Sequence, residues 1–126
     1  MGTDGAFESF RRAEALLAAR RPLEALRELE TVYDAAPDAP SVHLLAGRAY
    51  LKSAQLRHAE QAFLRVLELD PADHYAYFAL GRTLQRQGRL AEAQSKLKVA
   101  GAMNPLPEYQ EALGEVRARI AVREQN

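Results

Sequence analysis

Apolar residues recur along the chain at the three- and four-residue steps of an amphipathic helix. In segment 22–35 they fall at Leu23, Leu26, Leu29 and Val32, which places them on one stripe of a helix. Proline-containing breaks at 36–40, 70–73 and 104–107 separate segments of this kind. Because a residue before proline is pushed out of the α region, we expect helices to end at these breaks.

The pattern predicts an all-α fold of seven helices without a strand. The first five residues are small and polar, so we expect them to be frayed. Gly88 supplies a left-handed turn between two of the helices. Alanine, leucine and arginine, all good helix formers, are common throughout. The expected helices span residues 6–20, 22–35, 40–53, 56–69, 74–87, 90–103 and 108–123.

The breaks and several small residues repeat with a constant period of 34 residues. Three prolines and three alanines keep this period: Pro37, Pro71, Pro105, Ala25, Ala59 and Ala93. Gly47 and Gly81 keep it as well, although glycine inside a helix costs about 1 kcal/mol relative to alanine. We therefore expect both glycines to lie where two helices cross closely, with the alanines as the partner positions.

This pattern resembles the tetratricopeptide-repeat signature, W-x2-L-G-x2-Y…A-x3-F…P. The second copy matches it at Gly47, Tyr50, Ala59, Phe63 and Pro71. The resemblance covers residues 6–107 and divides one domain, residues 1–126, into repeats 6–39, 40–73 and 74–107. It implies a right-handed superhelix of antiparallel helix pairs, an α-solenoid with a concave face.

Segment 108–123 differs from the repeats because its apolar residues form one narrow stripe among charged ones. The stripe consists of Tyr109, Leu113, Val116 and Ile120. One apolar edge and a polar outside predict a C-terminal capping helix that covers the last repeat. We therefore expect the array to end within this chain.

In the family, one face of the first helix of each repeat lines the concave groove. The resemblance therefore implies a partner-binding groove formed by Phe7, Phe10, Glu14, Leu44, Arg48, Leu51, Lys52, Tyr75, Phe78, Arg82, Gln85 and Arg86. Its apolar floor and flanking cations suit an amphipathic helix or an acidic peptide, since guanidinium groups bind carboxylates in a bidentate manner. The alternative is that the apolar members pack on one another or under the C-terminal helix, with the arginines simply solvated.

One subset of the family binds chaperone tails through a carboxylate clamp of lysine and asparagine residues. The corresponding positions here are Phe10, Glu14 and Leu45. The resemblance therefore does not imply that specific activity.

Composition removes several classes of function. Seventeen basic and 17 acidic residues balance, so no overall field favours nucleic acid or an anionic membrane. Without cysteine there is no disulfide, thiol nucleophile or cysteine zinc site. No apolar run approaches the ~20 residues of a membrane span. The N-terminus lacks a basic region followed by a hydrophobic one, so we expect no secretory signal and a cytoplasmic location.

Residues suited to catalysis or metal binding do not cluster. His43 occupies a large aromatic position of the repeat and is expected in the core, whereas His58 and His74 lie near turns and are expected at the surface. No two histidines share helical spacing with a carboxylate, so we expect no metal and no cofactor. The leading hypothesis is a non-enzymatic adaptor or scaffold that captures a peptide or helix of a partner protein. The alternative is homodimerisation through the same groove or the terminal helix.

Overall fold

The computed structural model describes residues 2–126, with side chains from Gly5 onwards, and these residues form seven helices and no strand. The helices are α1 (Gly2–Ala18), α2 (Pro22–Ala35), α3 (Pro40–Lys52), α4 (Leu56–Leu69), α5 (His74–Arg86), α6 (Leu90–Met103) and α7 (Pro107–Gln125). The predicted all-α class and the seven helices are confirmed.

The expected and observed helices differ most at the two ends of the chain. Helix α1 begins at Gly2, four residues before the expected start at residue 6, while Met1 lies outside the described residues. Helix α7 continues to Gln125, two residues beyond the expected end at 123. The apolar pattern marks only the part of a helix that is packed, and the helical backbone continues past it.

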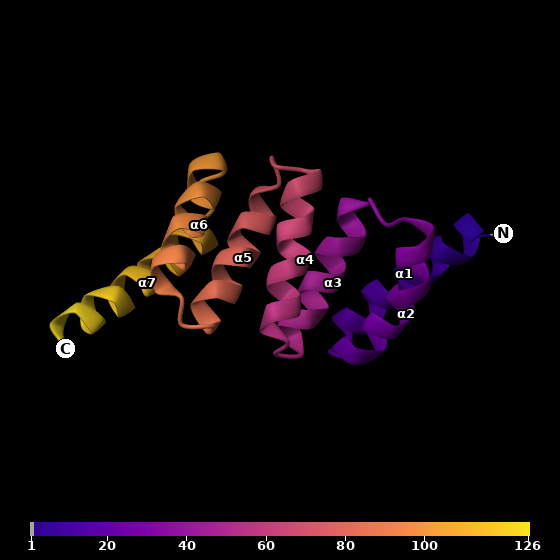
Figure 1. Ribbon diagram of the computed structural model, residues 1–126, viewed down its shortest axis with the longest axis horizontal. Coiled ribbons are helices and arrows are strands. Elements are labelled where there is room, and N and C mark those ends of the chain that lie inside the picture. The colour runs from indigo at the N-terminus through magenta and orange to yellow at the C-terminus, as the bar shows by residue number, and fades with distance from the viewer. Residues whose placement is uncertain (1) are drawn as a thin grey trace.

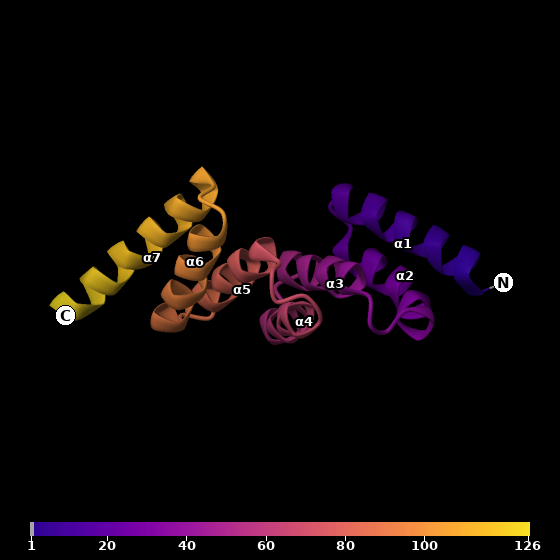
Figure 2. The ribbon, with the colours of Figure 1, turned by 90° about the horizontal axis from the view of Figure 1, so that it is seen from above.

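Consecutive helices form antiparallel hairpins that stack in chain order along the long axis of the molecule (Figure 1). Helix α1 packs on α2, α3 on α4 and α5 on α6, and α7 packs on α6. Seen from above, α3 and α5 lie in the middle, with α1 and α7 rising on either side (Figure 2). The fold is a right-handed α-solenoid whose concave side is formed by the odd-numbered helices.

The turn inside each helix hairpin contains one residue with a left-handed backbone. Arg20 has φ 63°, Ala54 φ 60° and Gly88 φ 79°, and the three are spaced by the repeat period. In each turn a backbone N–H just beyond that residue donates to a carbonyl of the preceding helix: Arg21 to Leu16, Gln55 to Tyr50 and Arg89 to Leu84. Such bonds satisfy carbonyls that a helix end would leave unpaired. The left-handed turn was expected only at Gly88.

The two glycines predicted at helix crossings lie at such crossings. A Cβ atom on Gly47 would lie 2.5 Å from Cε1 of Phe63, and one on Gly81 would lie 2.7 Å from Cγ of Leu97. The partner alanines Ala59 and Ala93 are fully buried. Close approach of the two helices in each hairpin therefore depends on the missing side chain.

Buried apolar side chains form two clusters along the solenoid. The N-terminal core contains Ala13, Leu17, Ala25, Leu29, Val32, Val42, Leu45, Ala46 and Ala49. The C-terminal core contains Ala59, Phe63, Ala79, Leu80, Leu84, Leu90, Ala93, Leu97, Ala112, Leu113 and Val116. The half-buried ring of Tyr50 packs against both cores. Helix α7 contributes three members of the C-terminal core, which confirms its predicted capping position.

Candidate binding groove

Helices α3, α5 and α7 surround a hollow of about 580 Å³ on the concave side, which we call the groove. It is lined by Arg48, Leu51, Lys52, Tyr75, Phe78, Arg82, Gln85, Arg86 and Arg119. All but Arg119 belong to the set expected from the sequence. The predicted residues of α3 and α5 come together because those helices lie side by side at the base of the concave side (Figure 2).

The other four expected residues do not line the groove. Phe10 packs against the N-terminal core and Leu44 against the C-terminal core. Phe7 is 62% exposed, with the Arg11 guanidinium 5.8 Å from its ring centre. Glu14 is exposed on α1. Helix α1 lies at the other end of the concave side from α7, so its residues stand apart from the groove (Figure 2).

The floor of the groove is aromatic and half-buried. The ring centres of Tyr75 and Phe78 lie 6.0 Å apart, and Phe78 stacks on Tyr109 of α7 at 4.7 Å. Burial raises the pKa of Tyr75, and the nearby Arg48 guanidinium opposes that rise. Both rings are thus held by packing on one side while the other side faces the groove.

Five cations line the groove and no acid does: Arg48, Lys52, Arg82, Arg86 and Arg119. The chain as a whole is neutral, so this is a local segregation of charge. Arg86 donates from Nη1 to the carbonyl of Leu51 at 2.9 Å, which places its charge at the C-terminus of α3, where a helix favours cations. The groove therefore presents a positive surface around an apolar floor.

Glu115 of α7 pairs with one of these cations from the edge of the groove. Arg82 donates from Nη1 both to Oε2 of Glu115 at 2.7 Å and to Oε1 of Gln85 at 3.0 Å. The hydrogen bonds from Arg82 and then from Gln85 lower the pKa of Glu115. Sequence reasoning missed Glu115 and Arg119. Their four-residue spacing shows that they share a face of one helix, but not which neighbour that face meets.

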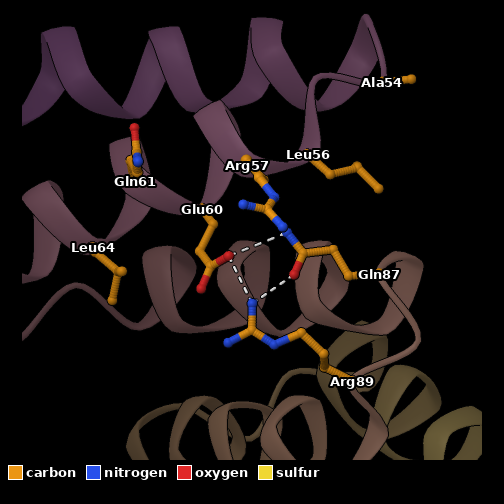
Figure 3. A pocket seen from close by; sticks show the side chains of 8 residues that line it. All are labelled: Ala54, Leu56, Arg57, Glu60, Gln61, Leu64, Gln87 and Arg89. Atoms are coloured by element: carbon orange, nitrogen blue, oxygen red, sulfur yellow. Dashed lines mark hydrogen bonds and ion pairs between the residues drawn. The ribbon is translucent and has the colours of Figure 1, made fainter.

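A second hollow of about 710 Å³ lies between α4 and the turn that joins α5 to α6. Figure 3 shows its lining residues, among which the side chains of Glu60, Gln87 and Arg89 are joined by hydrogen bonds. Glu60 accepts hydrogen bonds from Arg89 Nη1 at 2.8 Å and Gln87 Nε2 at 3.2 Å. These side chains meet each other's hydrogen-bonding needs across two consecutive hairpins. We therefore interpret this hollow as part of the contact between neighbouring repeats.

His74 connects the starts of α5 and α7, although a surface position was expected. Its Nδ1 lies 2.7 Å from the hydroxyl of Tyr109, and its Nε2 lies 3.2 Å from the amide nitrogen of Asn104. Among the residues with described side chains, no group of three histidines, aspartates or glutamates could hold a metal ion. His74 is therefore interpreted as a structural contact beneath the capping helix.

The fold and the groove define an α-solenoid of helix hairpins with a concave surface. Two family models described as tetratricopeptide repeat match the chain, one over residues 16–76 and the other over 62–95. The chain belongs to the tetratricopeptide-repeat family, with three repeats and a C-terminal capping helix. A comparison with curated proteins gave no match.

Solved structures with the same fold cover nearly the whole chain. The first TPR domain of human RPAP3 has 19% sequence identity, with 96% of each chain covered and a TM-score of 0.89. The first TPR of Spaghetti (RPAP3), bound to the HSP90 peptide SRMEEVD, has 18% identity, with 94% of each chain covered and a TM-score of 0.88. MamA has 15% identity over 94% of this chain and 70% of that one, with a TM-score of 0.87. The TM-scores show that this chain and these proteins share a fold.

No helix in residues 2–126 is both long and apolar enough to cross a membrane.

Proposed function

We propose that this chain is a non-enzymatic protein-interaction module, an adaptor or scaffold that holds a peptide or helix of a partner protein in the groove. The observation behind the proposal is the charge segregation in the groove, which is lined by five cations and half-buried aromatic rings, with Glu115 at its edge paired to only one of the cations. Apolar side chains of a bound segment would cover the exposed sides of Tyr75 and Phe78. Its polar groups would meet the surrounding guanidinium groups.

Related structures support this kind of function without identifying the partner. The first TPR of Spaghetti is bound to an HSP90 peptide, and the second TPR domain of human RPAP3 is in complex with the HSP70 peptide SGPTIEEVD. The proposal treats residues 1–126 as one domain with repeats 6–39, 40–73 and 74–107 and a cap at 108–123. The proposal includes no catalytic residue, metal or cofactor.

The test is capture of proteins from a lysate of the source cell by wild type and by an Arg48→Glu, Lys52→Glu double variant. Both residues lie on the groove side of α3 and are exposed, so the fold should persist while capture is lost. An Arg27→Glu, Arg57→Glu variant makes the same charge change on α2 and α4 and should capture as wild type does. Capture should also weaken as salt rises, because exposed charges are screened over about 8–10 Å. An unchanged set of captured proteins would contradict the proposal.

A second copy of the chain is the alternative partner. Val122 is 58% exposed near the end of α7 and lines a shallow hollow with Ala118, which gives the terminal helix an apolar contact surface. Sedimentation at two protein concentrations separates the alternatives. A concentration-dependent dimer that Val122→Ser abolishes would favour self-association.

A further inference from the structure

The contact between Glu115 and Arg82 is a carboxylate bound at the edge of a cationic groove. Among the described residues, Arg82 is the one groove cation with an ion pair, and its partner comes from the capping helix. Gln85, which is nearly buried, holds the guanidinium through its Oε1 and turns its Nε2 towards the same carboxylate oxygen at 3.5 Å. Arg82 and Gln85 thus form a small oriented set of donors that already holds one carboxylate.

The other cations that line the groove lack a carboxylate partner in the part of the chain that the structure describes. Arg48, Lys52 and Arg119 form no ion pair within the described residues, and Arg119 lies one helical turn beyond Glu115 on α7. Glu115 is therefore a single negative charge against a cluster of positive ones. Glu115 alone cannot balance the whole cluster of cations, whereas a bound segment with several acidic groups would.

We propose that Glu115 is a built-in competitor for the groove: its carboxylate occupies the Arg82–Gln85 donors until a carboxylate of an acidic partner segment displaces it. This proposal deepens the proposed function, on which it rests. The occupant is a segment of another protein that alternates apolar and acidic side chains. The apolar groups contact Tyr75 and Phe78, and the acidic groups meet Arg82 and the unpaired cations.

Exchange of one carboxylate for another is feasible because the internal pair is exposed. The side chains of Arg82 and Glu115 are 38% and 56% exposed, and exposed ion pairs contribute little to stability. Release of Glu115 leaves α7 in place, since the buried Tyr109, Leu113 and Val116 anchor that helix. The displaced carboxylate returns to water, and the donors keep an equivalent partner.

The experiment uses a fluorescently labelled peptide of alternating leucine and glutamate, blocked at both ends, and a matched peptide with glutamine in place of glutamate. Anisotropy titrations compare wild type, Glu115→Gln and Glu124→Gln. Glu124 is an exposed residue of the same helix, half a turn around from Glu115, so its variant controls for the lost charge. A double variant with Arg82→Gln added to Glu115→Gln removes the donor as well.

The acidic peptide should bind Glu115→Gln roughly two- to fivefold more tightly than wild type, as loss of an exposed competing ion pair predicts. Glu124→Gln should bind as wild type, the double variant should lose the gain, and the neutral peptide should bind weakly to all four. Thermal melting checks that α7 stays docked. Equal or weaker binding by Glu115→Gln would overturn the competitor role. If neither wild type nor any variant binds the acidic peptide, the assignment of an acidic segment as the occupant is wrong. Whether the groove binds a partner protein at all is tested separately, by the capture experiment with the Arg48→Glu, Lys52→Glu variant.

Discussion

Single residues set the spacing within each helix hairpin. Gly47 and Gly81 lie at the same position of consecutive repeats, opposite Phe63 and Leu97, and each lacks room for even one more carbon atom. The sequence allowed this prediction because glycine in a helix is costly and its recurrence at a fixed period needs a compensating contact. The cost of the glycine is offset by burial of the large side chain opposite it.

Gly81→Leu should lower the free energy of unfolding by about 1–3 kcal/mol through overpacking. Gly114 provides a matched control, because it also lies in a helix but has nothing within 4 Å of a Cβ atom. Gly114→Leu should raise stability by up to about 1 kcal/mol, since only helix propensity changes. Urea denaturation measures both variants. Equal effects of the two substitutions would show that Gly81 is not at a tight crossing.

The three hairpin turns share one backbone geometry but not one residue type. Left-handed φ values favour glycine, which is why Gly88 was recognised and the turns at Arg20 and Ala54 were not. At those two positions the repeat requires a left-handed backbone, although arginine and alanine do not favour that conformation. Local residue preference therefore could not have predicted these two turns, although the repeat period could have.

Ala54→Gly should stabilise the protein by about 1 kcal/mol. A left-handed backbone costs a residue with a Cβ about 1–2 kcal/mol, which glycine avoids. Glycine loses more conformational entropy on folding than alanine does, and this offsets part of the gain. Gly88→Ala should destabilise it by a similar amount. A Cβ on Gly88 would have its nearest neighbour, the Arg123 guanidinium, at 3.5 Å, so the loss would reflect backbone strain alone. Thermal denaturation tests both changes, and a destabilised Ala54→Gly variant would contradict this account.

At the scale of elements, α7 has a role that the sequence indicated only in part. Its apolar stripe predicted a cap, and Tyr109, Leu113 and Val116 are indeed buried. The contribution of Glu115 and Arg119 to the groove was not predictable in this way. Groove positions on α3 and α5 follow from the repeat, whereas α7 lies outside the repeat signature and its angle depends on three-dimensional packing.

Deletion of residues 107–126 should destabilise the protein strongly and promote aggregation. Each large apolar side chain that is fully buried contributes about 1.5–3 kcal/mol. The deletion removes Tyr109, Leu113 and Val116 and exposes the surfaces of α5 and α6 on which α7 packs. Deletion of residues 121–126 is the control, because those residues are exposed and their loss should leave the melting temperature nearly unchanged. A stable, monomeric 1–106 fragment would show that α7 is not needed as a cap.

At the scale of the whole molecule, the solenoid has two hydrophobic cores in series. The N-terminal core lies within α1, α2 and α3, and the C-terminal core extends from α4 to α7. Among the half-buried apolar side chains in the described part of the chain, Tyr50 is the one that packs against both. The period predicted the stacking of repeats, but not this division, because the division depends on which half-buried side chains meet at the α3–α4 boundary.

A matched pair of leucines can test whether the two cores unfold separately. Leu29 and Leu97 occupy the same position two periods apart, and both are fully buried, so replacing either with alanine should cost about 2–5 kcal/mol. In repeat proteins each unit contacts only its neighbours. Leu29→Ala should therefore speed amide hydrogen exchange in α1–α3 while leaving α5–α7 protected, and Leu97→Ala should do the reverse. Exchange measured by mass spectrometry resolves the segments. Uniform loss of protection in both variants would mean that the two cores open as one cooperative unit.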